Sequence, residues 1–259
     1  MYTKGTLLND LRDMNIDPKG TLLVHSSMKA IGQVEGGADT VIDALMEYMK
    51  DGLLVFPTHT WAQMSREYTV FDVKSEPSCV GLLTNIFRSR PGVKRSLHPT
   101  HSVAAYGKDA EDFVAGEENS KTPCARSGCW GKLLDRHAQI LFLGCPLSKN
   151  TFLHGVEEWN DIPNRLNKVV QVFTSVDENG VRHEIPQHRH HCEEPKIPDV
   201  SQHYIKMESP FLKGNAISYG VFGSAKCVVG DAVKMAEITS AYLKKDAHLF
   251  DDYTPVQML

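Results

Sequence analysis

The chain has 259 residues and a formal net charge of −4 at neutral pH, with 41% hydrophobic and 23% charged residues. This is the composition of a globular protein with a substantial core, and it excludes the strongly basic surface of a typical nucleic-acid-binding protein. Small cationic partners are mildly favoured. Because the amino-terminal residues lack an apolar signal core and no apolar run reaches the length of a membrane span, we predict a cytoplasmic protein that does not interact with membranes.

The cysteines are scattered along the chain without a Cys-x-x-Cys pair. In a chain of this length without an export signal, they are predicted to be reduced thiols rather than a disulfide framework. The closest pair, Cys124 and Cys129, lacks the spacing of a zinc module. We therefore predict no metal requirement.

Two apolar strands are predicted in the first part of the chain, and polar residues follow both. A helix over 6–15 precedes the strand 21–25, and a helix over 40–50 precedes the strand 53–56. Ser26 and Ser27 directly follow the first strand, and their hydroxyls and amides could hold a phosphate, or they could simply cap a helix. Because polar residues follow the carboxyl ends of both strands, the two ends are expected to share a crevice at one edge of the sheet.

The middle of the chain contains a second group of polar candidates. Residues 65–77 are polar and aperiodic, which predicts a surface loop that could act as a lid, and 79–90 is predicted to be a helix. Arg95, His98 and Ser102 come just before a short apolar strand. They could place a cation beside a phosphate and a hydroxyl beside a reacting carbonyl, or they could form a structural turn.

The main candidate for a catalytic site lies where a predicted strand leads into a predicted helix. Gln139 to Gly144 is strand-like, and a helix is predicted to begin at Asn150 or Thr151. His154 and Glu157 are three residues apart on this helix, so the carboxylate could hold the imidazole in one tautomer and favour its protonated form. This pair could act as a general base, or it could be an ordinary solvated helix pair.

The sequence of the last third of the chain predicts a hairpin of 168–176 and 181–185, paired strands within 217–229, and a helix that ends at Lys245. No internal repeat or linker is visible. We predict one domain over 1–259 of the α/β class, with a central, mostly parallel or mixed sheet and helices on both faces. Residues 168–215 would form a hairpin and loop insertion on the substrate side.

Four blocks of the sequence, in this order, resemble the aminoglycoside 3-N-acetyltransferase family, antibiotic N-acetyltransferases that use acetyl-coenzyme A. The blocks are Val24-His25-Ser26-Ser27-Met28-Lys29-Ala30-Ile31-Gly32 with Gly36-Gly37-Ala38, Phe56-Pro57-Thr58-His59-Thr60, His98-Pro99-Thr100-His101-Ser102-Val103-Ala104-Ala105-Tyr106-Gly107, and Leu141-Phe142-Leu143-Gly144 followed by Asn150-Thr151-Phe152-Leu153-His154-Gly155-Val156-Glu157. The resemblance implies that family's fold, which differs from the common GCN5-related fold. It also implies acetyl transfer to the 3-amino group of a 2-deoxystreptamine antibiotic.

The resemblance also implies a role for each matching residue. His154 and Glu157 would be the catalytic pair, and Ser102 would hydrogen-bond the oxyanion of the tetrahedral intermediate. Coenzyme A would be held along its pyrophosphate and pantetheine arm by Ser26, Ser27 and Lys29, near its thioester by Thr58, Ser102 and Val103, at a phosphate by Arg95, and also by His25 and His98.

Other functions remain open from the sequence. The acceptor could be a different small amine, or the protein could be a hydrolase with Ser102 as nucleophile and His154 as its base, although no Gly-x-Ser-x-Gly motif supports this. A metal-binding or ligand-binding protein built around His188, His190, His191 and Cys192 is a third reading. A monomer and a homodimer are equally compatible with the sequence.

Overall fold

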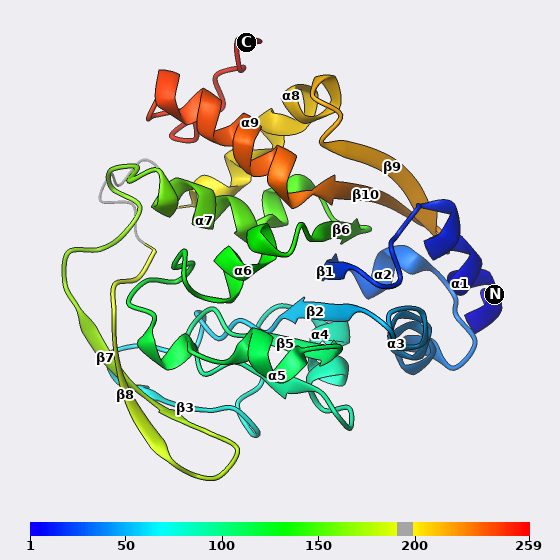
Figure 1. Cartoon of the computed structure of the whole chain (residues 1–259), viewed down its shortest axis with the longest axis horizontal. Coiled ribbons are helices and arrows are strands. Elements are labelled where there is room, and N and C mark those ends of the chain that lie inside the picture. The colour runs from blue at the N-terminus through cyan, green and yellow to red at the C-terminus, as the bar shows by residue number, and fades with distance from the viewer. Residues whose placement is uncertain (191–198) are drawn as a thin grey trace.

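The computed structural model describes residues 1–190 and 199–259, and its centre is a mixed sheet in the order β4-β5-β2-β1-β6-β10-β9 (Figure 1). The parallel strands β1 (Thr21–Ser26), β2 (Leu53–Pro57) and β6 (Gln139–Leu143) form its middle. The flanking strands β5 (Val103–Gly107) and β10 (Ala225–Asp231) run antiparallel to β2 and β6. The edges are β4 (Lys94–Arg95) and β9 (Ile217–Phe222).

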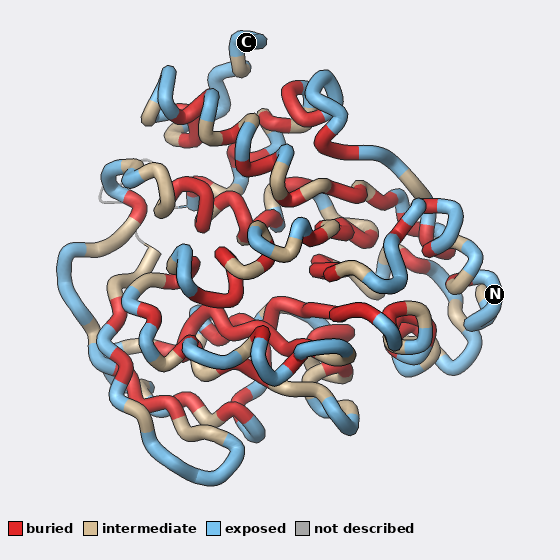
Figure 2. Tube along the Cα trace, in the orientation of Figure 1, coloured by how far each residue is buried: buried red, intermediate tan, exposed pale blue. Residues whose placement is uncertain are grey.

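Helices cover both faces of this sheet because its central strands are apolar on both sides. Leu22 and Val24 of β1 belong to one buried cluster, and Leu23 between them belongs to the other. The first cluster packs under α1 (Lys4–Asp13), α3 (Gly37–Tyr48) and α4 (Leu82–Arg88), the second under α6 (Cys129–Asp135), α7 (Thr151–Trp159) and α9 (Ala232–Lys245). Burial is densest along these strands, as Figure 2 shows. The predicted α/β class with helices on both faces is confirmed.

The remaining elements are short. They are α2 (Met28–Ile31), α5 (Ala110–Val114), α8 (Glu208–Lys213) and the 3-10 helices η1 (Glu117–Asn119), η2 (Leu147–Lys149) and η3 (Val200–Met207).

The predicted hairpin is present, but it belongs to a second sheet. Strands β7 (Gln171–Val176) and β8 (Arg182–Gln187) pair antiparallel, and β3 (Val70–Asp72) pairs parallel to β7. Figure 1 shows this small sheet at the end of the molecule away from α1. The prediction of a surface loop over 65–77 was therefore wrong in part, because Phe71 is fully buried against Phe173.

Two further features bear on the sequence predictions. No helix in the described ranges has the length and apolar composition needed to span a membrane. The single domain over 1–259, with 168–215 as an insertion, stays a prediction.

Candidate functional site

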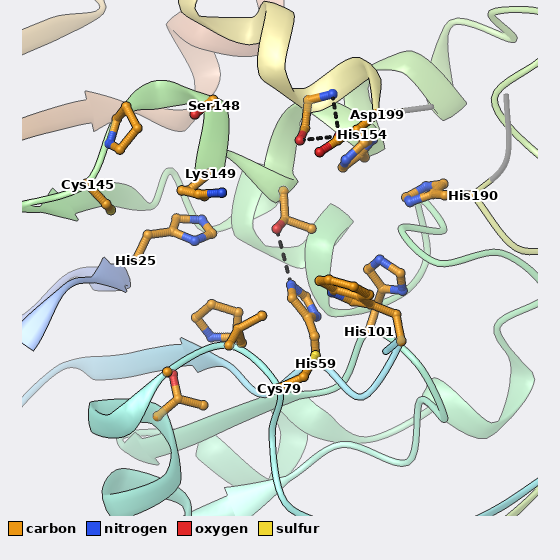
Figure 3. A pocket seen from close by; sticks show the side chains of 18 of the residues that line it. His25, His59, Cys79, His101, Cys145, Ser148, Lys149, His154, His190 and Asp199 are labelled. Atoms are coloured by element: carbon orange, nitrogen blue, oxygen red, sulfur yellow. Dashed lines mark hydrogen bonds between the residues drawn. The ribbon is translucent and has the colours of Figure 1, made fainter. Parts of the chain in front are cut away.

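A pocket of about 890 Å³ opens where the central parallel strands end (Figure 3). Its wall includes His25 and Ser26 from β1, Pro57 from β2 and Gly144 directly after β6. The carboxyl ends of parallel strands meet at one sheet edge, so their following loops surround one crevice. The predicted shared crevice is thus confirmed as a feature of the fold. The volume is that of a site for a small ligand.

The turn after β6 depends on Gly144. Its φ of 67° lies in the left-handed region, and a Cβ atom there would clash with the side chain of Ala30 on α2. This close approach lets the chain turn from the strand into η2 and α7. Ser148, Lys149, Thr151 and His154 are thereby placed on the pocket wall, and Figure 3 shows Lys149 close to His25.

His154 is joined to Glu157 through a tyrosine. The Tyr204 hydroxyl lies 2.7 Å from Nδ1 of His154 and donates to Oε2 of Glu157 at 2.5 Å. Since the hydroxyl proton goes to Glu157, Nδ1 of His154 must carry its own proton and donate it to Tyr204. In this tautomer Nε2 of His154 has a free lone pair, which is the form that a general base requires.

This arrangement corrects two expectations about the pair. The Nδ1–Oε2 distance between His154 and Glu157 is 3.8 Å, too long for a hydrogen bond, so the carboxylate acts on the imidazole through Tyr204. Burial, followed by the repulsion that a protonated His190 would exert, also lowers the pKa of His154 well below its usual value. The ring is therefore held neutral rather than protonated.

A buried ion pair anchors the far end of this chain of contacts. Arg165 donates from Nε to Oε1 of Glu157 at 2.5 Å and from a terminal nitrogen to Asp251 at 2.6 Å. Burial alone would lower the pKa of Arg165. The carboxylates of Glu157 and Asp251 outweigh this effect, so the pKa of Arg165 is raised. Burial raises the pKa of Glu157, against the opposing charge of Arg165. The guanidinium and the Tyr204 hydroxyl thus both favour the ionised form of the Glu157 carboxylate.

Several histidines other than His154 also lie along the pocket. His190 stacks on His154 with ring centroids 4.4 Å apart, and His101 lies 5.0 Å from His190. His59 follows at 4.8 Å from His101, and its Nε2 lies 3.1 Å from the Thr151 hydroxyl (Figure 3). Burial is the first cause that lowers the pKa of each of these rings, so the row is neutral around pH 7.

Ser102 does not reach the pocket wall. It is fully buried, and its hydroxyl donates to the backbone carbonyl of Thr58 at 2.8 Å while lying 2.9 Å from the Thr58 hydroxyl. No hydrogen bond in the described part of the chain joins Ser102 to a histidine. This geometry is inconsistent with the expected oxyanion contact, and it also disfavours a hydrolase with Ser102 as nucleophile.

Arg95 is also withdrawn from the pocket, although a phosphate contact was expected for it. Its guanidinium donates to the backbone carbonyls of Thr58 at 2.8 Å and Glu76 at 2.6 Å, and it lies over the Phe71 ring. With its donors used in this way and only 7% of its surface exposed, it holds the 58–76 segment in place rather than binding a ligand.

The remaining coenzyme A candidates divide into two groups. His25, Ser26 and Ser27 line the pocket, as expected. Thr58, Val103 and His98 are buried behind it, with His98 accepting the amides of Thr100 and His101. Lys29 is exposed on α2 and outside the pocket wall, whereas Lys149, which the sequence did not single out, lies on it.

Stability should depend on pH through His25, whose ring stacks on Phe142 while its Nε2 is buried without a partner. Burial lowers the pKa of His25 to about 3. The unfolded chain therefore binds a proton below about pH 6.5 that the folded protein excludes, so stability is lost as the pH falls. From pH 7 to pH 5 we expect this residue to contribute a loss of about 2 kcal/mol.

Urea denaturation at both pH values would measure this effect. The His25→Asn variant should lose less stability on acidification than the wild type, by about the same 2 kcal/mol. His137→Asn, a change at an exposed position, is the matched control and should keep the wild-type pH dependence. Equal pH dependence in His25→Asn and the wild type would refute the assignment.

Solved structures that share this fold include acetyltransferases of one type. The chain superimposes with a TM-score of 0.80 on a histidine-to-alanine mutant of aminoglycoside acetyltransferase AAC(3)-IVa in complex with a gentamicin, at 24% identity over 96% of this chain and 91% of that one. It superimposes equally well, at 0.80, on AAC-IIIb in a binary complex with CoASH, at 22% identity over 98% and 99%. The fold is thus that of the aminoglycoside acetyltransferases.

The sequence comparisons define the family. The model of the aminoglycoside 3-N-acetyltransferase family matches residues 23–244, so the chain belongs to this family. Among curated relatives, aminoglycoside N(3)-acetyltransferase III of Acinetobacter baumannii is 26% identical over 95% of this chain and 92% of its own length. The resemblance identified from the four sequence blocks is confirmed.

Proposed function

We propose that this protein transfers the acetyl group of acetyl-coenzyme A to the 3-amino group of a 2-deoxystreptamine aminoglycoside, with His154 as general base. The observation that carries the proposal is that Ser26 and Ser27, at the end of β1, and His154, on α7, line the same pocket. The names of the relatives and the CoASH and gentamicin complexes of proteins with this fold support the choice of both substrates.

Coenzyme A is proposed to bind along the β1 and η2 side of the pocket. The Ser27 side chain makes no capping bond to α2, so its hydroxyl is available to a ligand. Lys149 supplies a positive charge on the same wall, and Ser148 lies next to it. Hydroxyls and an ammonium group are suitable partners for a pyrophosphate.

The amine is proposed to enter from the side of His190 and Asp199. Asp199 lines the pocket close to His154 in Figure 3, and its carboxylate is an anionic partner for a cationic substrate. The amine nitrogen attacks the thioester carbon while Nε2 of His154 takes its proton, and the C–S bond then breaks. The protonated His154 gives the proton to the departing thiolate, which yields coenzyme A and returns the ring to its neutral form.

The protein's contribution to this step is orientation and charge. Tyr204 keeps the proton of His154 on Nδ1, so that Nε2 faces the reaction as a base. The positive ring formed in the step is stabilised through Tyr204 by the Glu157 carboxylate. The proposed chemistry requires neither a metal ion nor an acyl-enzyme. Acetyl-coenzyme A is a cytoplasmic metabolite, which agrees with the predicted location.

A thiol-release assay tests the proposed function. Purified protein with acetyl-coenzyme A should release free thiol in the presence of aminoglycosides that contain 2-deoxystreptamine, and it should release little with simple amines. Release only with simple amines would contradict the assigned acceptor, and rapid release without any amine would indicate a hydrolase.

The proposed position of the coenzyme A phosphate groups predicts different effects for two lysines. Lys149→Ala should raise the KM for acetyl-coenzyme A about fivefold at low salt and leave kcat unchanged, because a charged hydrogen bond to the ligand is lost. Lys29→Ala is the matched control, since Lys29 is exposed outside the pocket, and it should change neither parameter. A larger effect at Lys29 than at Lys149 would place the phosphates on α2 instead.

Tyr204 is predicted to be a positioning residue. Tyr204→Phe removes only the hydroxyl that orients His154, so kcat should fall about tenfold with KM for both substrates unchanged. The matched control is Tyr219→Phe, which removes an exposed hydroxyl bonded to Glu208. Steady-state kinetics would reject the role if kcat of Tyr204→Phe stayed within about twofold of the wild-type value.

A further inference from the structure

Three side chains of different chemistry converge beside the histidine row. Cys124 lies in the segment between η1 and α6, Glu158 is on α7, and His190 follows β8. One potential ligand atom from each, a sulfur, a carboxylate oxygen and an imidazole nitrogen, lies within 4.8 Å of the other two. Residues from three distant segments thus meet at one point.

Hydrogen bonds from neighbouring groups reach only one of the two oxygens of the Glu158 carboxylate. Its Oε1 accepts from the Cys124 amide at 3.0 Å and from Nε2 of His190 at 2.6 Å. Its Oε2 is buried and has no hydrogen-bond partner of good geometry, although the Thr122 side chain lies near enough to lower the pKa of the carboxyl against the larger, opposite effect of burial. The Glu158 side chain is only 5% exposed. A buried carboxylate oxygen without a partner is costly, and a cation bound there would remove that cost.

The donor set selects the type of cation. A thiolate, an imidazole and one carboxylate are ligands for zinc and chemically similar ions, whereas calcium and magnesium prefer oxygen ligands alone. A divalent ion with one thiolate and one carboxylate is electrically neutral overall, which favours a buried position. Three protein ligands leave the fourth position of a tetrahedron for water.

We propose that Cys124, Glu158 and His190 bind a zinc ion that cross-links the 121–125 segment, helix α7 and the end of β8. The ion would fix the His190 ring, which stacks on His154 at 4.4 Å. Its role is structural, and it does not enter the acetyl-transfer step. The site shares His190 with the cluster of His188, His190, His191 and Cys192 suggested by the sequence, but its other two ligands come from outside that cluster. His191 and Cys192 lie outside the described residues.

Metal binding can be measured directly on the full chain purified without a histidine tag. After removal of metal, titration with zinc against a chromophoric chelator should give one site per chain with a Kd below about 1 μM. Cobalt in place of zinc should produce the near-ultraviolet absorption of a thiolate ligand. Thermal unfolding should shift upward with zinc.

Variants assign the ligands. Cys124→Ser and Glu158→Gln should each weaken zinc binding about 100-fold and remove the zinc-dependent shift in Tm, and Cys124→Ser should abolish the cobalt–thiolate band. Cys227→Ala, a buried cysteine on β10, is the matched control and should bind zinc normally. The double variant His188→Ala/Cys192→Ala tests the histidine-rich segment.

Two results would overturn the proposal. The first is a wild-type protein that binds no zinc below about 100 μM and gives no thiolate band with cobalt, a result that does not depend on the folding of any variant. The second is tight zinc binding that the His188→Ala/Cys192→Ala double variant abolishes and the Cys124 and Glu158 variants leave unchanged. That result would place the ion on the histidine-rich segment.

Discussion

Replacing His154 with alanine should lower kcat for acetyl transfer about 10³-fold, because the variant lacks the base proposed to take the proton of the amine. The residues proposed to hold coenzyme A, Ser26, Ser27 and Lys149, are unchanged in this variant, so the binding of coenzyme A should change little. Steady-state thiol release measures kcat, and calorimetric titration with coenzyme A measures binding. Loss of the former with retention of the latter is the expected result.

A matched histidine change gives the reference for this experiment. His183→Ala removes a ring on β8 that pairs with Asp177 and is not part of the pocket, and it should leave kcat within about twofold of wild type. If kcat of His154→Ala also stayed near the wild-type value, His154 would not be the base. If coenzyme A binding were lost as well, the effect could not be assigned to proton transfer.

The second large effect is expected in stability, at Glu157. Its carboxylate is fully buried and receives hydrogen bonds from Arg165 and Tyr204. Glu157→Ala leaves the buried guanidinium with Asp251 as its remaining ionic partner, so the free energy of unfolding should fall by about 3 kcal/mol or more. Urea denaturation at pH 7 measures this change.

An exposed ion pair provides the comparison. Asp135→Ala removes the partner of Arg126 at a site where both side chains are about half exposed, and it should cost less than about 1 kcal/mol. A loss at Glu157 no greater than that at Asp135 would show that the ion pair with Arg165 does not anchor α7.

The elements near the pocket could be predicted because their signals are local. Polar residues follow the apolar runs at 21–25 and 139–144, and this pattern indicates two strands that end at a shared crevice. The structure contains the two strands and the crevice. The i, i+3 spacing likewise placed His154 and Glu157 on one helix face.

The contacts that orient His154 could not be predicted because they join residues distant in sequence. Tyr204 is 50 positions from His154, and Asp251 is 86 positions from Arg165. Their positions depend on how η3 and the carboxyl-terminal segment pack against α7, and nothing in their local sequence indicates this contact. The contact of His190 with His154 could not be predicted for the same reason, since it depends on how β7 and β8 fold.

Three predicted site residues that lie behind the pocket show a different limit. Ser102 and Thr58 lie in sequence blocks typical of the family, and Arg95 lies just before the block of Ser102. The three side chains nevertheless hydrogen-bond to one another behind the pocket. A motif identifies which residues belong together, but not whether a hydroxyl points toward a ligand or toward a backbone carbonyl. His101, the neighbour of Ser102, is the residue of that block that lines the pocket.

The proposed reaction is tested most directly by identifying its product with acetyl-coenzyme A labelled with ¹³C in the acetyl group. After incubation with gentamicin and the protein, NMR and mass spectrometry of the product should show one acetyl group, bonded to the 3-amino nitrogen of 2-deoxystreptamine. Labelled acetate as the main product, or an acetyl group on another nitrogen or on oxygen, would contradict the assignment.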